Sequence, residues 1–292
     1  MTILVTGATG KLGRLVVEAL LERNVPAEQI VAGGRNLSRL ADLAQLGVQV
    51  RAMDYSDPAS LREAFTGVEK LLLVSGSEPG PRVAQHLDVI ETAKDAGVQL
   101  LAYTSIPNAD TTTMALAEDH QTTERALRDS GVPYVLLRNG WYLENYTEQL
   151  TGYLKHGSVF GSAGDGRLNG ATRADLAQAA AAVLLAEDQA GMVYELGGEE
   201  SFTLEDLARE VSTATGQAVT YQDLSEEDFS HLLTGAGVPV SFARILADSD
   251  SGIARGELLV EGNALATLIG RPATTLGEAV RFAAATLAAQ QA

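Results

Sequence analysis

Three evenly spaced glycines near the start of the chain place the strongest constraint on its fold. Gly7, Gly10 and Gly13 follow an apolar, β-branched stretch at 2–6 and open a stretch with helical periodicity at 11–23. This order predicts a strand, a tight turn at Gly7, a close backbone approach to a pyrophosphate at Gly10 and close helix–strand packing at Gly13. Unpaired N–H groups at the start of such a helix bind phosphate. The segment therefore predicts a dinucleotide-binding βα unit.

The first half of the chain alternates short β-rich stretches with helical patterns. Strands are expected at 2–6, 29–33, 49–53, 70–75, 99–104 and 134–138, and helices at 11–23, 37–46, 58–65, 82–96 and 118–130. Several of these strands are apolar throughout, which is typical of a sheet that helices cover on both faces. Strict alternation with short connections predicts right-handed βαβ units. We therefore expect an α/β fold with a doubly wound parallel sheet, the Rossmann fold.

The residue after the second expected strand indicates which dinucleotide is preferred. An Asp or Glu at this place binds the adenosine ribose hydroxyls, whereas this chain has Arg35 after Gly33 and Gly34. A guanidinium is permanently charged and pairs in bidentate fashion with a phosphate, such as the 2′-phosphate of NADP. We therefore expect NADPH to be preferred over NADH. The alternative is an arginine that stacks on the adenine or takes no part in binding.

The pattern changes after residue 140. Helices are expected at 173–187, 204–215, 226–234, 241–246, 264–269 and 276–289, and a short strand at 192–196. Residues 1–140 are therefore predicted to form an NADP-binding Rossmann domain, and residues 141–292 a smaller, mainly helical domain on the substrate side. At this point the sequence leaves open whether residues 171–200 return to the Rossmann sheet.

The composition excludes several classes of function. The 292 residues include no cysteine, which removes disulfides, thiolate nucleophiles and iron–sulfur clusters and suits a reducing, cytoplasmic location. The formal net charge of −17 argues against nucleic-acid binding. No stretch is long and apolar enough for membrane insertion. Because no metal-ligand spacing surrounds His86, His120, His156 or His231, we expect no metal site.

Several segments together resemble one known family. They are 6–13, 68–75, 102–105, 137–145, 163–166, 171–175, 247–250 and 268–270. In these segments the chain resembles the bacterial NAD(P)H:quinone oxidoreductases, which are NmrA-like, atypical members of the short-chain dehydrogenase/reductase superfamily. The glycine motif marks only the superfamily, whereas the segment Arg138-Asn139-Gly140-Trp141-Tyr142 is far more specific.

The resemblance implies that NADPH reduces quinones by two electrons, through direct hydride transfer and without flavin. Carried across residue by residue, the cofactor contacts fall on Gly7, Ala8, Thr9, Gly10, Lys11, Leu12, Arg35, Ser75, Gly76, Ser77, Asn139, Gly140, Trp141, Tyr142, Leu143, Glu144 and Arg173. Serine is more usual in the family at position 76, so a backbone contact of Gly76 survives the change but a hydroxyl contact does not. The NmrA-like family also contains proteins that bind dinucleotide and control a partner. A non-catalytic NADP(H)-binding redox sensor is therefore the alternative function, and a homodimer stays open.

The expected catalytic residue is His120. The chain lacks the Tyr-x-x-x-Lys pair of a typical short-chain dehydrogenase, and counting back from Tyr134 places His120 near the helix lysine of the isoflavone-reductase-like relatives. A histidine that titrates near neutrality can donate a proton to a reduced oxygen. Reduction of a quinone, however, gives a well-stabilised hydroquinone anion, so proximity supplies most of the acceleration. We therefore expect His120 mainly to line the quinone pocket.

Aromatic and amide side chains follow the expected strand at 134–138. They are Trp141, Tyr142, Asn145 and Tyr146. Aromatic rings can stack on a flat substrate, so these four residues are the predicted substrate pocket. The alternative is that Trp141 only fills the core.

Overall fold

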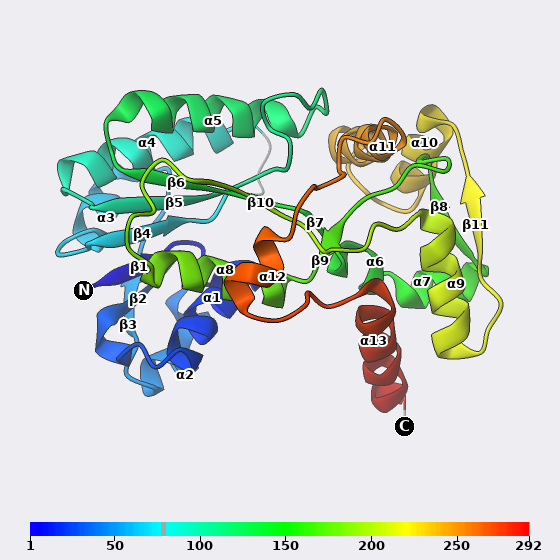
Figure 1. Cartoon of the computed structure of the whole chain (residues 1–292), viewed down its shortest axis with the longest axis horizontal. Helices are drawn as coiled ribbons and strands as arrows, with labels where there is room; N and C mark the ends of the chain where they lie inside the picture. The colour runs from blue at the N-terminus through cyan, green and yellow to red at the C-terminus, as the bar shows by residue number, and fades with distance from the viewer. Residues whose placement is uncertain (77–79, 292) are drawn as a thin grey trace.

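A parallel sheet forms the larger part of the molecule. The computed structural model describes residues 1–76 and 80–291. Within these residues the sheet has seven strands, β1 (Ile3–Val5), β2 (Ile30–Gly34), β3 (Gln49–Ala52), β4 (Lys70–Leu73), β5 (Leu100–Ser105), β6 (Tyr134–Asn139) and β10 (Val193–Leu196). Their order is β10-β6-β5-β4-β1-β2-β3, and each neighbouring pair is parallel (Figure 1). The predicted doubly wound Rossmann sheet is therefore confirmed.

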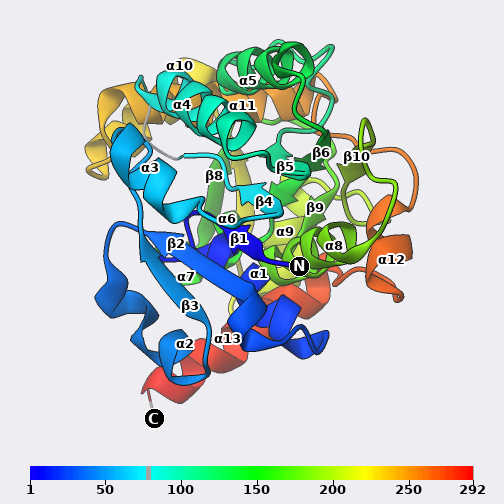
Figure 2. The ribbon, with the colours of Figure 1, turned by 90° about the vertical axis from the view of Figure 1, so that its left-hand side faces the viewer.

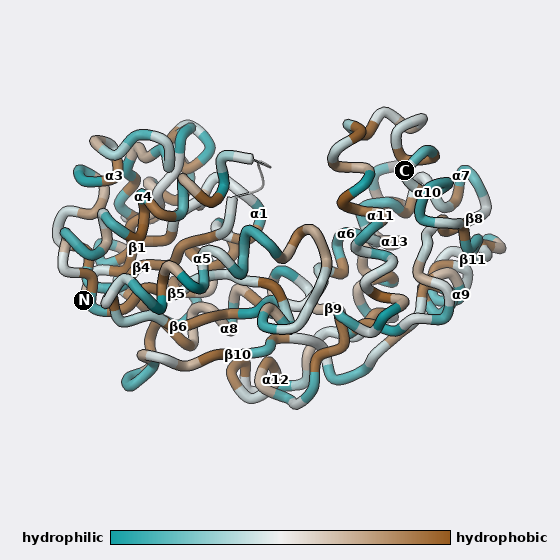
Figure 3. Tube along the Cα trace, turned by 90° about the horizontal axis from the view of Figure 1, so that it is seen from above, coloured by the Kyte–Doolittle hydropathy of each residue, from teal (hydrophilic) through white to brown (hydrophobic). Residues whose placement is uncertain are grey.

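Helices cover both faces of this sheet, as Figure 2 shows. One face carries α3 (Pro58–Ala64), α4 (Arg82–Asp95) and α5 (Ala117–Ser130), and the other carries α1 (Lys11–Glu22), α8 (Arg173–Leu185) and α12 (Ala264–Ile269). The short elements η1 (Ala27–Gln29), η2 (Leu37–Leu40) and α2 (Ala41–Gln45) flank β2. Ile3 and Val5 belong to one core cluster and Leu4 to the other. Because both faces are buried, the central strands are apolar along their length (Figure 3).

The smaller part of the molecule is mainly helical and follows the carboxyl end of β6. Its helices are α6 (Glu144–Thr147), α7 (Leu150–His156), α9 (Leu204–Thr215), α10 (Glu226–Gly235), α11 (Val240–Ala254) and α13 (Leu276–Gln291). The short strands β7 (Trp141–Tyr142) and β9 (Gly170–Ala171) pair with each other, as do β8 (Ser158–Gly161) and β11 (Thr220–Asp223). A third core cluster, with Phe202, Leu207 and Ile253 among its members, holds these elements together.

Part of the chain beyond residue 140 returns to the large sheet. β10 pairs with β6 along its edge, with Val193 opposite Leu136. α8, which directly precedes β10, packs along α1 on one face of the sheet. The chain therefore passes from the sheet to the smaller part and back, and the division of the chain at residue 140 stays a prediction.

Two of the predicted elements differ from the observed ones. The helix expected at 241–246 is too short, because α11 continues to Ala254 and buries Ala247 and Ile253 in its second half. The helix expected at 37–46 opens as a 3-10 turn, in which the Asn36 side chain accepts the N–H of Ser38 at 3.1 Å. The short strands β7, β8, β9 and β11 escaped prediction because two to four residues are too few to show an alternating pattern.

Candidate active site

The turn between β1 and α1 has a geometry that requires its glycines. Gly7 has a φ of +59°, a left-handed conformation that glycine adopts without strain. Gly10 caps α1 and donates its N–H to Gly7 O at 2.8 Å. A Cβ atom at Gly13 would lie 2.5 Å from Gly7 O, so no other residue allows the helix to pack this closely. The start of α1, with its phosphate-binding N–H groups, is thus held against β1.

Arg35 is exposed at the carboxyl end of β2, next to the glycine-rich turn. A Cβ atom at the preceding Gly34 would lie 2.6 Å from Thr9 Cγ2, so the strand end packs tightly on that turn. Burial raises the pKa of the Tyr55 hydroxyl, and a hydrogen bond with Thr6 and the nearby charge of Arg35 partly offset this effect. The guanidinium therefore stands beside the turn that is expected to hold the phosphates, and its role there stays a prediction.

Two hydrogen bonds fix the backbone just beyond β4. Ser75 donates its N–H to Thr104 Oγ1 at 2.9 Å, and Gly76 donates its N–H to His86 Nε2 at 3.1 Å. A Cβ atom at Gly76 would meet its nearest neighbour at 3.6 Å, so the serine that is usual in the resembled family would fit there as well. Ser77, the next predicted contact, lies outside the described residues.

The end of β6 and the segment that follows it contain buried polar atoms without a hydrogen-bond partner. Four such side-chain atoms occur among the described residues, and three of them are Asn139 Oδ1, Glu144 Oε2 and Tyr146 Oη. Buried polar atoms nearly always have a hydrogen-bond partner, so several without one in a short stretch of the chain point to a polar ligand there. The resemblance assigns this same segment to the cofactor and the substrate. The residues present therefore fit a bound dinucleotide.

A group of charges joins this segment to the glycine-rich turn. The Arg173 guanidinium donates to Glu148 Oε1 at 2.9 Å and to Asn145 Oδ1 at 3.2 Å, and it lies 4.9 Å from the centre of the Tyr142 ring. The other carboxylate oxygen of Glu148 accepts a hydrogen bond from Lys11 Nζ at 2.6 Å. Burial alone would raise the pKa of Glu148, but the two cations lower it overall. The fold thus brings Lys11, Tyr142 and Arg173 to one place.

The four predicted pocket residues differ in how deeply they are buried. Trp141, Tyr142 and Asn145 are half-buried, whereas Tyr146 is buried and its ring meets Phe202 edge-on at 6.1 Å. The Trp141 indole lies beside the Tyr146 hydroxyl, although the two do not form a hydrogen bond of good geometry. Trp141 therefore packs on the core while part of its ring stays accessible, which leaves both interpretations of this residue open.

The surroundings of His120 favour its neutral ring. Its ring is buried, and Nδ1 is hydrogen-bonded with the Tyr103 hydroxyl at 2.8 Å. Burial lowers the pKa of His120 to about 3, and the charges of Arg82 and His86 add to the effect. A lowered pKa favours the neutral ring, which argues against an imidazolium proton donor and agrees with the expected place of His120 in the lining of the quinone pocket. Its participation in catalysis stays a prediction.

Comparison with known proteins identifies the family. The model of the NAD(P)H-binding family matches residues 7–187, which is more than half of the chain. The chain belongs to the NAD(P)H-binding family. Quinone oxidoreductase 2 of Escherichia coli K12 is 50% identical over 278 residues, which cover 95% of this chain and 97% of that protein. The expected resemblance to the NmrA-like quinone oxidoreductases is therefore confirmed.

Two solved structures resemble this NAD(P)H-binding protein over nearly its whole length. The NADPH-dependent quinone oxidoreductase of Escherichia coli, complexed with NADPH, matches with a TM-score of 0.93 and 50% identity over 96% of this chain and 99% of that one. The Citrobacter sp. triphenylmethane reductase complexed with NADP(H) matches with a TM-score of 0.92 and 40% identity over 97% of this chain and 100% of that one. Within the described residues, no helix is long and apolar enough to cross a membrane, and no group of three or more acidic or histidine side chains could hold a metal ion.

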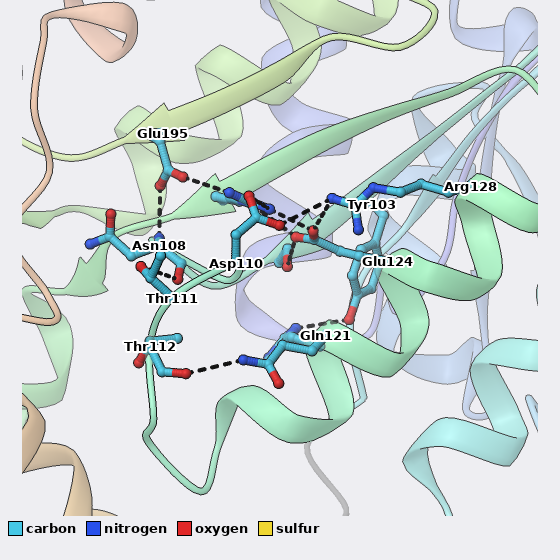
Figure 4. Close-up of polar contacts among 12 residues, drawn as sticks. Tyr103, Asn108, Asp110, Thr111, Thr112, Gln121, Glu124, Arg128 and Glu195 are labelled. Carbon is cyan, nitrogen blue, oxygen red and sulfur yellow. Dashed lines mark hydrogen bonds and ion pairs between the residues drawn. The ribbon is translucent and has the colours of Figure 1, made fainter.

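Sequence reasoning missed a buried charge network beside the site of this family member. Arg138 at the end of β6 donates to Glu124 Oε2 at 2.7 Å and Oε1 at 3.0 Å, and to Glu195 Oε1 at 3.0 Å (Figure 4). Asp110 pairs with the same guanidinium at 2.8 Å. Burial disfavours the charge, but these hydrogen bonds raise the pKa of Arg138 overall. An arginine inside an otherwise apolar strand is the signal that could have revealed this network.

The loop between β5 and α5 links this network to the smaller part of the molecule. The Asn108 N–H donates to Glu195 Oε2 at 3.1 Å, and the Asn108 side-chain amide donates to Leu259 O at 2.7 Å. Farther along the loop, Thr112 Oγ1 donates to Glu257 Oε2 at 2.7 Å. The loop therefore fixes α5, which carries His120, relative to the smaller part.

Sequence reasoning also missed a buried acid in α11. Asp250 Oδ2 accepts the N–H of Ser162 at 2.9 Å, and Tyr146 is among the groups that its charge affects. Burial, and to a lesser extent the charge of Asp223, raise the pKa of Asp250 to about 7. Burial therefore favours the protonated form of Asp250 over a wider pH range than for an exposed aspartate.

Proposed function

We propose that this protein catalyses the NADPH-dependent two-electron reduction of quinones, by direct hydride transfer and without flavin, in the cytoplasm. The observation that carries the proposal is the match, at 50% identity and over nearly the full length of both chains, to an NADPH-dependent quinone oxidoreductase. The buried side-chain atoms of Asn139, Glu144 and Tyr146 that have no hydrogen-bond partner support it, because these residues belong to the segment where this proposal requires a polar ligand.

The proposal assigns the residues of the site to parts of the cofactor. The glycine-rich turn from Gly7 to Leu12 holds the pyrophosphate, Arg35 holds the 2′-phosphate, and the loop after β4 and the segment from Asn139 to Glu144 hold the nicotinamide half with Arg173. Bound NADPH supplies both electrons and one hydrogen as a hydride. Trp141, Tyr142, Asn145 and Tyr146 stack and orient the quinone in this assignment.

Steady-state assays test the proposed function directly. Purified protein should be colourless and should oxidise NADPH continuously with a panel of benzoquinones and naphthoquinones in the presence of a chelator. A yellow preparation whose activity disappears with the flavin would contradict direct hydride transfer. Tight NADPH binding without turnover on any acceptor would instead favour the non-catalytic redox sensor.

Removal of the Arg35 side chain should erase the preference for NADPH over NADH. One charge-assisted contact with the 2′-phosphate is worth about 1.5–3 kcal/mol, or roughly 10- to 100-fold in affinity. Titration of both cofactors into wild type and Arg35→Ala measures this difference. Arg62→Ala, which removes an exposed arginine at the end of α3, serves as the control and should keep the preference. Equal preference in wild type and Arg35→Ala would remove Arg35 from this role.

A further inference from the structure

A row of hydrogen bonds runs from the loop after β4 to the start of α5. Gly76 donates its N–H to His86 Nε2 at 3.1 Å, and His86 Nδ1 lies 2.9 Å from Thr123 Oγ1. The Thr123 hydroxyl donates to Asp119 O at 2.8 Å. Because Nε2 of His86 accepts a hydrogen bond, the neutral ring carries its hydrogen on Nδ1 and donates it to Thr123. Every donor in this row is thereby assigned.

The same reasoning assigns the hydrogen on His120. The Tyr103 hydroxyl is buried and lies 2.8 Å from His120 Nδ1. Thr123, whose hydroxyl is also close to Tyr103, already donates to a carbonyl and accepts from His86. A buried hydroxyl that failed to donate would carry an energetic penalty, so Tyr103 donates to Nδ1 of His120. The neutral His120 ring therefore carries its own hydrogen on Nε2.

The charge state of His120 is set by its surroundings. Burial, chiefly, together with the positive charge of Arg82 lowers the pKa of both His120 and His86 to about 3. Arg82 is buried at the start of α4, and its Nε lies 3.7 Å from Asp119 Oδ2. The titratable and charged groups around the rings are Tyr103, His86, Arg82, Asp119 and Glu124. These surroundings favour the neutral form of the His120 ring.

The strand order places His120 toward the acceptor end of the site. Arg35 follows β2 and the glycine-rich turn follows β1, while Gly76 follows the neighbouring β4 and Tyr103 lies in β5. A dinucleotide that binds across the carboxyl edge, with its 2′-phosphate at Arg35 and its pyrophosphate at β1, extends its nicotinamide over β4 and β5. His120, which is hydrogen-bonded with Tyr103, lies on this side of the sheet.

We propose that His120 acts as a neutral hydrogen-bond donor, through its Nε2–H, to a carbonyl oxygen of the quinone. Tyr103 and Arg82 are positioning residues, since the first fixes the tautomer and the second the charge. This inference rests on the proposed function. Two electrons and one hydrogen pass from NADPH to one quinone oxygen, which becomes a hydroxyl, and the opposite oxygen becomes a phenolate. The Nε2–H hydrogen-bonds to the phenolate and keeps its hydrogen, and solvent later supplies the proton.

Nitrogen NMR tests the tautomer without any turnover. The chain has four histidines, so the signals of His120 and His86 are identified by their loss in His120→Gln and His86→Gln. In wild type, His120 should show a protonated Nε2 and His86 a protonated Nδ1, both unchanged between pH 5 and 9. Tyr103→Phe should reduce the preference of His120 for the Nε2–H form. A protonated Nδ1 on His120, or an imidazolium at pH 6, would overturn the inference.

Kinetics of two substitutions separate hydrogen bonding from proton transfer. The amide of His120→Gln retains a donor near the place of Nε2, whereas His120→Ala retains none. We expect His120→Ala to lower kcat by about 10- to 100-fold and His120→Gln by less than about threefold, with NADPH affinity unchanged in both. The kcat of wild type should show no transition attributable to His120 between pH 5 and 9.

His231→Gln, which changes an exposed histidine of α10, should match wild type in every readout. If His120→Gln is as slow as His120→Ala, a proton-transfer role replaces the one inferred here. If wild type reduces no quinone, the proposed function fails, and the NMR result still decides whether the tautomer was assigned correctly.

Discussion

Replacement of Arg138 by methionine should lower the free energy of unfolding by about 3–5 kcal/mol, the usual result of removing one partner of a buried ion pair. The Glu124 side chain is only 1% exposed, and its carboxylate accepts two hydrogen bonds from Arg138. Ser105 and Arg128 remain as partners of Glu124 in the variant, but neither replaces both lost bonds. Denaturation by urea, followed by circular dichroism, measures the change.

A second substitution shows whether the buried charge of Glu124 is the cause. Glu124→Gln added to Arg138→Met removes the buried negative charge, so the double variant should be less destabilised than the sum of the two single variants. Arg125→Met, on the exposed side of the same helix, is the matched control and should change stability by less than about 0.5 kcal/mol. Additive effects of the two buried substitutions would show that Arg138 and Glu124 do not act as a pair.

Replacement of Asp250 by asparagine should stabilise the protein at alkaline pH and leave it unaffected in acid. The pKa of Asp250 is raised to about 7 in the folded protein, chiefly by burial, so the folded state binds more protons than the unfolded state between about pH 4 and 7. Stability from this group is therefore present below pH 4 and lost as the pH rises through 7. The full difference is on the order of 4 kcal/mol above pH 7.

The measurement must compare the two proteins at each pH, because other groups titrate in the same range. His86 and His120 have their pKa lowered to about 3, so each contributes stability that is lost as the pH falls below about 6.5. The difference in unfolding free energy between Asp250→Asn and wild type removes this common background. Asp165→Asn, an exposed change in the loop after β8, is the matched control and should change stability by less than about 0.5 kcal/mol. A pH-independent difference for Asp250→Asn would show that its carboxyl titrates normally.

The fold was predictable because the signals for it are local. The glycines at 7, 10 and 13 and the apolar strands mark their own structure within a few residues, and the sheet has the expected topology. The end of α11 was missed because burial of Ala247 and Ile253 depends on packing against segments that are distant in the sequence.

The chemistry of the site was less predictable because distant residues determine it. The neutral state of His120 depends on burial and on Arg82, which lies on another helix. Likewise, Glu148 binds both Lys11 and Arg173, and no local sequence pattern around Glu148 predicts either contact. Residue types and spacing could identify these positions as candidate site residues, but their charge states and partners depend on the tertiary structure.

The return of β10 and α8 to the large sheet ties the two parts of the molecule into one cooperative unit. A fragment that ended at residue 140 would leave β6 as an open edge and would uncover the apolar surface of α1 on which α8 packs. Exposed edges and apolar surfaces of this kind promote aggregation. The solubility of the nucleotide-binding half therefore depends on β10 and α8, which follow part of the other half in the chain. During synthesis, the sheet is completed only after residue 196 has emerged from the ribosome.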